Sequence, residues 1–347
     1  MLHRIYSVLV ILLVLTIAPV SAAFAASDSE PPELASAVPT ATAAPEVTAA
    51  PEASPAELDI PDEETPLANP NLLLEEDESV TPASPAPSGS PLLLDPSDSV
   101  VPLTIDGKPY AGTSILHDGI TYVQLREFCS VMGEGVSVAW DGETQTVTVA
   151  SPPISFTLNV ADPYIVANGR YLYIPGGAVV HEGLTFVPVR TLAKAFGADC
   201  VWFESSQSID VRRGTTPLES GDDFYDETDL YWLSRIISAE ARGESLKGQI
   251  AVGNVVLNRA AAKGYPDTIK GVIFDRTGGV QFTPASNGTI YKDPTKNAVI
   301  AAKLALDGAD IAGQSLFFLN AKIAASKWII KNCVFVVSIG NHDFYSL

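Results

Sequence analysis

The strongest constraint on the fold is an internal repeat between residues 101 and 213. Residues 119–126 read GITYVQLR, and residues 183–190 read GLTFVPVR. Each copy continues through a short helical stretch to a glycine and a tryptophan (Trp140 or Trp202), and it ends in an alternating strand. Alternation of period two around Gly-rich turns predicts short strands. We therefore expect residues 101–214 to form a duplicated, β-rich module with one small helix in each copy.

The duplicated start resembles the N-terminal domain of copper amine oxidases, which recurs as a stalk module on secreted bacterial proteins. The region holds two histidines, His117 and His181, too far apart in sequence for a ligand pair. We therefore expect no metal and interpret the module as structural or surface-binding, in contact with the wall or a protein. Arg126 and Arg190 are expected to fix the repeat by pairing with backbone or a carboxylate.

The residue pattern at the N-terminus of the sequence predicts that the protein is exported. His3 and Arg4 precede an apolar run of about ten residues and a small-residue stretch that ends at Ala25, which is the order of a secretory signal. That run is shorter than the roughly 20 residues a transmembrane helix needs. We place a cleaved signal peptide at residues 1–25, with retention as an anchor as the alternative. The mature protein is expected to be secreted to the cell wall or spore envelope, with no stable membrane insertion.

Residues 26–100 are expected to be a disordered linker rich in Pro, Ala and Ser. They hold roughly sixteen Asp and Glu and no Lys or Arg, so most of the net charge of −20 lies there. Such a composition buries too little apolar surface to offset its ordering entropy. An acidic chain without clustered Lys or Arg also argues against nucleic acid as a partner.

From residue 226 to 347 the pattern becomes helical and then strand-like. Apolar residues spaced by three and four predict a first helix capped by Thr228 and a second that starts after Ser245. A third is expected after Asp267 and a fourth from Asp293 to Gly308. Apolar runs at 316–319 and 334–339 predict strands of a small antiparallel sheet. This order indicates an α+β domain.

The end of the first predicted helix carries Glu240. A glycosidase needs an acid whose pKa is raised by apolar surroundings, and the rest of this helix is strongly apolar. A hydrolase also needs a second carboxylate, and Glu244 is the nearest candidate in sequence. The pair would share a helical face at this spacing, but Gly243 and Ser245 predict a helix break between them. A structural role for Glu244 stays open.

Residues 226–347 resemble the catalytic domain of the SleB-type spore cortex-lytic enzymes, a cell wall hydrolase family. The resemblance rests on the segments AEARGE (239–244), GQIAV (248–252), VLNR (256–259), YPDTI (265–269), GVI (271–273), QFT (281–283), FFLN (317–320), SKW (326–328) and IGNH (339–342). There are two departures. Residue 238 is Ser where relatives often carry Gly, and the stalk-like module replaces the usual peptidoglycan-binding repeat.

The resemblance implies a lysozyme-like fold and cleavage of peptidoglycan between N-acetylmuramic acid and N-acetylglucosamine. It implies lytic transglycosylase chemistry, in which Glu240 acts first as acid and then as base and no cofactor is needed. Other candidate substrate-binding residues follow from the matching segments, each with an ordinary structural role as its alternative: Glu244, Gln281, Phe282, Thr283, Asn320, Trp328 and His342.

Four other functions were weighed for this chain. A zinc amidase needs a His/Glu/His set, which the single histidine of the C-terminal region does not supply. A cysteine peptidase would pair Cys333 with His342, but Cys333 borders an apolar strand rather than starting a helix. A muramidase that uses Glu240 with a second carboxylate and a non-catalytic wall-binding protein remain as alternatives.

Overall fold

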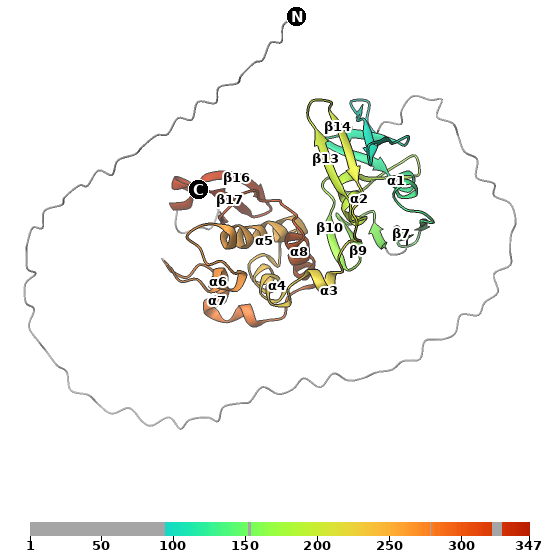
Figure 1. Cartoon of the computed structure of the whole chain (residues 1–347). Coiled ribbons are helices and arrows are strands. Elements are labelled where there is room, and N and C mark those ends of the chain that lie inside the picture. Colours follow the sequence, from blue (N-terminus) through green and yellow to red (C-terminus); the bar gives the residue numbers. More distant parts are fainter. Residues whose placement is uncertain (1–93, 152–153, 278, 321–327) are drawn as a thin grey trace, which may run out of the picture. The chain divides into compact units, whose positions relative to one another are not determined.

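The computed structural model describes residues 94–151, 154–277, 279–320 and 328–347. The predicted signal peptide and most of the predicted linker lie outside these ranges. Helices and sheets are mixed, as expected, with a β-rich N-terminal region and a C-terminal region dominated by helices (Figure 1). Among the described residues, no helix combines the length and apolarity needed to cross a bilayer.

The first sheet of the N-terminal region joins the two sequence copies. Strands β5 (Ile120–Gln124) and β12 (Leu184–Pro188) are its equivalent strands, and they pair antiparallel with Val123 opposite Val187. The other strands of this sheet are β1 (Ser99–Val100), β4 (Ser114–His117) and β11 (Val179–His181). Because β1 pairs with β4, the last residues of the predicted linker belong to this sheet.

Two further sheets complete the N-terminal region. The antiparallel one comprises β6 (Ser137–Asp141), β7 (Thr146–Ser151), β8 (Ile154–Asn159), β9 (Tyr164–Ala167) and β10 (Arg170–Tyr173). The other comprises β2 (Leu103–Ile105), β3 (Lys108–Pro109), β13 (Asp199–Phe203) and β14 (Ser208–Arg212), with β14 parallel to β2.

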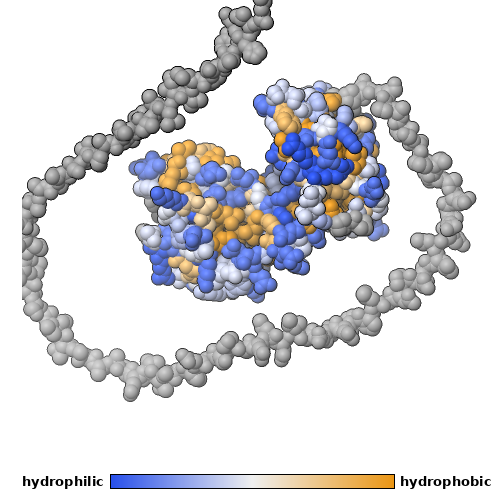
Figure 2. Space-filling view, in the orientation of Figure 1, coloured by the Kyte–Doolittle hydropathy of each residue, from blue (hydrophilic) through white to orange (hydrophobic). Residues whose placement is uncertain are grey.

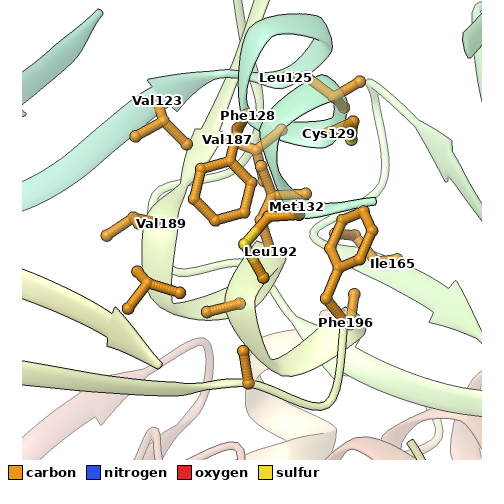
Figure 3. Packing of buried hydrophobic residues seen from close by; sticks show 14 of the residues in the cluster. Val123, Leu125, Phe128, Cys129, Met132, Ile165, Val187, Val189, Leu192 and Phe196 are labelled. Atoms are coloured by element: carbon orange, nitrogen blue, oxygen red, sulfur yellow. The ribbon is translucent and has the colours of Figure 1, made fainter. Parts of the chain in front are cut away.

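The one small helix expected in each copy is present. Helix α1 (Leu125–Met132) follows β5, and α2 (Val189–Ala195) follows β12. Their apolar faces meet in one core, where Phe128 from the first copy lies near Leu192 and Phe196 from the second (Figure 3). Burial of these apolar surfaces stabilises the region.

The expected pairing of the two repeat arginines is wrong. Arg126 and Arg190 are both exposed, and neither guanidinium makes a hydrogen bond or ion pair with any residue that the structure describes. Each arginine is the second residue of its helix, so its side chain points away from the core that the neighbouring helical residues enter.

The C-terminal region has three main helices packed on one another: α4 (Glu227–Ala241), α5 (Leu246–Ala261) and α8 (Lys296–Leu306). Their core residues include Ile237, Val252 and Ala302, all fully buried. Shorter helices are α3 (Gly221–Phe224), α6 (Ile269–Phe274), α7 (Thr283–Asn287), the 3₁₀ turn Thr289–Tyr291 and α9 (Trp328–Asn332).

Helix starts differ in detail from the prediction. Asp226, not Thr228, caps α4, because its carboxylate accepts the backbone N–H of Asp229 at 2.9 Å. Thr268, not Asp267, caps α6. A side-chain oxygen at the cap accepts one of the N–H groups that the first helical turn leaves unpaired. Ser245 caps α5 as expected.

A three-stranded antiparallel sheet closes the C-terminal region in the order β15-β17-β16. Its strands are β15 (Phe317–Leu319), β16 (Val334–Ile339) and β17 (His342–Ser346). The outer strand β16 exposes Val334, Phe335 and Val336. Hydrophobic surface is visible on the end of the region that carries this strand (Figure 2).

One buried carboxylate ties strand β10 to the end of helix α8. Asp307 accepts hydrogen bonds from Arg170 at 2.9 and 2.8 Å and from the Tyr225 hydroxyl at 3.1 Å. The ammonium of Lys194 lies 2.6 Å from the same carboxylate. Contacts between α8 and β10 surround this group.

Candidate active site

Glu240 lies in the last turn of α4, at the edge of the helical core. Its neighbours Ile236, Ile237 and Ala241 are buried, whereas Glu240 itself is half-buried. Burial raises the pKa of the Glu240 carboxyl above its ordinary value. Within the described residues this carboxyl has no hydrogen-bond or ion-pair partner. A raised pKa favours the protonated form of the carboxyl, which is the form that a general acid uses.

The carboxyl opens into a cavity of about 660 Å³. The lining comes from the loop before α7, from β15 and from the start of α9, so the C-terminal sheet and the helices build it together. Its lining residues are Glu240, Arg259, Thr277, Gln281, Phe282, Thr283, Phe317, Phe318, Trp328 and Ile329. Glu240 is the sole carboxylate among these residues.

Arg259 is a cavity residue to which the sequence analysis assigned no role. Its guanidinium donates to the backbone oxygen of Leu316 at 2.7 Å and to the side-chain oxygen of Gln281 at 3.4 Å, and it lies over the rings of Phe282 and Phe317. Burial lowers the pKa of this group. The described residues contain no carboxylate paired with it. Arg259 belongs to the matching segment VLNR, but the composition of this segment does not predict that the arginine side chain lines a cavity.

The three residues of the predicted binding loop, Gln281, Phe282 and Thr283, all line the cavity, and each has a different structural role there. The Gln281 amide donates to the backbone oxygen of Thr277 at 3.0 Å and thereby holds its own loop. Phe282 is almost fully buried, and its ring packs near Phe318, so it forms the wall. Thr283 begins α7 at the cavity surface.

Trp328 also lines the cavity and is 55% exposed, with its ring 6.3 Å from that of Phe317. Asn320 and His342 are not among the lining residues. Asn320 directly follows β15 and is half-buried. The His342 ring packs edge-on against Phe318 at 5.3 Å, so it lies behind the cavity wall.

Glu244 is separated from the cavity. Its carboxylate accepts the backbone N–H of Asn341 at 3.2 Å and the Asn341 side-chain N–H at 2.9 Å. These hydrogen bonds hold the pKa of Glu244 below its ordinary value. The helix break expected after Glu240 is present, because α4 ends at Ala241 and α5 begins at Leu246. Glu244 thus makes the structural contacts that the sequence analysis gave as its alternative role, and substrate binding by Glu244 stays a prediction.

Comparison with known families identifies both regions. Residues 243–345 match the cell wall hydrolase domain. The C-terminal region is a cell wall hydrolase domain. Residues 104–211 match the copper amine oxidase N-terminal domain. The hydrolase match begins just after Glu240, so the role of that residue rests on its geometry.

Relatives of the hydrolase domain are spore cortex-lytic enzymes. The enzyme of Bacillus cereus is 36% identical over 120 residues, which cover 35% of this chain and 45% of that protein. The enzyme of Oceanobacillus iheyensis is 35% identical over 131 residues, which cover 38% of this chain and 46% of that protein. The chain thus spans less than half the length of these relatives.

Solved catalytic domains resemble the same part of the chain. One is the catalytic domain of the germination-specific lytic transglycosylase SleB from Bacillus anthracis, at 35% identity. The match covers 35% of this chain and 97% of that one, with a TM-score of 0.33. The other is the catalytic domain of Bacillus cereus SleB, at 35% identity, with 35% and 92% coverage and a TM-score of 0.32.

The described residues contain no group of three or more His, Cys, Asp or Glu side chains that could hold a metal ion. The cysteine peptidase alternative also lacks support, because burial raises the pKa of the Cys333 thiol. A thiol of this kind is a poor nucleophile at neutral pH.

Proposed function

We propose that this protein cleaves the glycan strands of peptidoglycan at the N-acetylmuramic acid to N-acetylglucosamine bond as a lytic transglycosylase. The observation that carries the proposal is Glu240, a half-buried carboxyl with raised pKa in an aromatic-walled cavity. The domain match and the names of the relatives give the substrate class.

In the proposed reaction, the Glu240 carboxyl first protonates the glycosidic oxygen of the leaving N-acetylglucosamine. The bond from this oxygen to the muramyl anomeric carbon breaks as the proton arrives. The Glu240 carboxylate then takes the proton from the muramyl 6-hydroxyl, whose oxygen bonds to the same carbon. The product carries a 1,6-anhydro ring, and Glu240 is protonated again.

This chemistry suits a cavity whose described lining holds a single carboxylate. A retaining hydrolase needs a second carboxylate about 5 Å from the acid, and an inverting one needs it farther away. Glu244 is not among the described lining residues, and its carboxylate accepts hydrogen bonds from Asn341 at the turn between β16 and β17. We assign the remaining cavity groups to substrate positioning: Trp328 offers an exposed ring to a sugar, and Arg259 offers a cation to an acidic substituent.

The wider proposal follows from the same observations. A helix-borne glutamate at a cavity between helices and a small sheet is the arrangement expected of a lysozyme-like domain. We propose that the protein acts outside the cytoplasm, on the cell wall or spore cortex. Residues 101–214 are proposed to contact that wall.

The test is the product released from purified peptidoglycan. The wild-type chain is expected to release muropeptides with 1,6-anhydro ends, detected by mass spectrometry. Glu240→Gln removes the transferable proton and is expected to lower this release at least 100-fold, the lower bound for a general acid. Its circular dichroism spectrum should be unchanged.

Gln281→Glu would not serve as a control because it alters the cavity, so Glu219→Gln, at an exposed position, is the matched carboxylate control. It should retain full activity. Reducing ends in place of anhydro ends would contradict the transglycosylase step, and no products from the wild-type chain would favour a wall-binding protein.

A further inference from the structure

The two copies of the N-terminal region pack so that residues of both copies lie side by side. Val123 and Val187 occupy equivalent places in the repeat and lie opposite each other in the antiparallel β5–β12 pair. Equivalent residues paired in opposite directions relate the copies by a local twofold rotation. The turn that starts one copy therefore lies beside the helix and strands of the other.

This packing builds two hollows from matching residues. The Trp140 hollow is lined by Trp140 and Arg126 of the first copy and by Gly183, Leu184 and Thr185 of the second. Its volume is about 220 Å³.

In the Trp202 hollow, the contributions of the two copies are reversed. Trp202 and Arg190 come from the second copy, and Gly119, Ile120 and Thr121 come from the first. Its volume is about 770 Å³, larger because it continues to the segment 307–310 after α8.

Both hollows present an exposed indole ring and a guanidinium. Trp140 is 51% exposed and Trp202 is 38% exposed, so each indole presents much of its ring at the surface. Arg126 and Arg190 have no hydrogen bond or ion pair within the described ranges. Each hollow thus places an exposed indole and a guanidinium without a partner among the described residues in one depression, which suits a ligand that has an apolar ring face and a carboxylate.

We propose that the Trp140 and Trp202 hollows are two equivalent binding sites for sugar units that carry a carboxylate, and that they hold one peptidoglycan strand at two points. The choice of peptidoglycan rests on the function proposed above. The indole accepts the apolar face of a pyranose ring, the guanidinium binds a lactyl or stem-peptide carboxylate, and the threonine hydroxyl bonds a sugar hydroxyl.

A repeating polymer suits a pair of equivalent sites. Once one hollow is occupied, the second binds a nearby unit of the same strand, so the combined affinity exceeds that of either hollow by about 10² or more. The hollows differ in one respect. The Trp202 indole N–H donates to Glu204 at 2.7 Å, whereas Trp140 makes no such bond among the described residues. The Trp202 ring is therefore the more firmly oriented.

The test uses the full chain with Glu240→Gln, so that the polymer is not digested. Binding to insoluble purified peptidoglycan is measured by cosedimentation. Trp140→Ala or Trp202→Ala is expected to weaken binding about 100-fold by removing the two-point contact. The double variant should retain only the binding that the Glu240 cavity supplies. Arg126→Gln and Arg190→Gln should weaken binding and reduce its dependence on salt.

Phe203→Ala is the matched control, because Phe203 is 39% exposed beside Trp202 on β13 and lines neither hollow. It should bind like the parent. Unchanged binding in both tryptophan variants, or an equal loss in F203A, would overturn the proposal. The proposed catalysis can fail separately. If the wild-type chain releases no products but the tryptophan variants still lose binding, the two hollows are supported and the proposed catalysis is contradicted.

Discussion

Glu240 and Glu244 are four positions apart in sequence, yet their surroundings shift the pKa values of the two carboxyls in opposite directions. Burial without a partner raises the pKa of Glu240, whereas hydrogen bonds from Asn341 lower the pKa of Glu244. One carboxyl is thereby suited to donate a proton and the other to remain a charged anchor. The two carboxyls have different surroundings because helix α4 ends between them and Glu244 lies against the turn of the sheet.

The pH dependence of stability tests the surroundings of Glu240. The folded protein holds this proton to a higher pH than the unfolded chain, so the free energy of unfolding falls as pH rises through the raised pKa. Glu240→Gln does not titrate. We expect it to melt at a higher temperature than wild type at pH 7.5, with the difference shrinking toward pH 4.

Thermal melts of both proteins at the two pH values measure this effect. A lower melting temperature of Glu240→Gln at pH 7.5 would show that the folded state favours the ionised carboxylate, contrary to the assigned acid role.

The sequence indicated Glu240 because its helix is strongly apolar, a local property. It did not indicate Arg259, because the aromatic rings and the Leu316 carbonyl around that guanidinium come from segments up to 58 residues away. Residue roles that depend on nonlocal partners lie beyond pattern analysis.

At the scale of elements, helices of two or more turns were predictable from the sequence, whereas the five-residue helices at the cavity were not. Helices α4, α5 and α8 carry apolar periodicity over two or more turns and end near glycine or a cap. Helices α7 and α9 have five residues each, too few to show a period. Both border the cavity, so part of the candidate site depends on elements without a sequence signal.

The turn between β16 and β17 depends on Glu244. Glu244→Gln weakens two charge-assisted hydrogen bonds to Asn341, and at this partly exposed position we expect a loss of roughly 1 kcal/mol of unfolding free energy at pH 7. Because the folded pKa is lowered, this contribution is present above the unfolded pKa and is lost as pH falls through the folded value.

Urea unfolding of Glu244→Gln at pH 7 and pH 3 measures the loss and its disappearance in acid. Glu219→Gln, which removes an exposed carboxylate elsewhere, should change neither value. A loss of equal size at both pH values would mean that the charge of Glu244 does not matter.

At the scale of the whole described chain, Asp307 is the most heavily used carboxylate. Burial alone would raise its pKa, but the hydrogen bonds from Arg170 and Lys194 outweigh burial and hold the pKa low. Arg170 and Lys194 belong to the copper amine oxidase-like region, and Asp307 belongs to the hydrolase domain. No sequence pattern indicated this contact, since Asp307 is 113 or more residues away from Lys194 and Arg170.

Asp307→Asn leaves the buried Arg170 without its counter-charge. We expect a loss of about 3–5 kcal/mol of unfolding free energy, the usual effect of breaking a buried ion pair. Differential scanning calorimetry of the chain should show a lower melting temperature, and Asp267→Asn, at an exposed position, should not change it. An unchanged transition would show that the two regions are stable without this contact.

The outer strand β16 has a consequence for handling the protein. Its outward edge carries backbone groups and the exposed side chains Val334, Phe335 and Val336, a combination that favours pairing with the same strand of another molecule. The acidic stretch 27–100 supplies most of the charge that keeps molecules apart. Removal of the part of that stretch that precedes residue 94 would take away much of this repulsion and leave the edge of β16 exposed. A chain shortened in this way should be kept dilute and at low ionic strength.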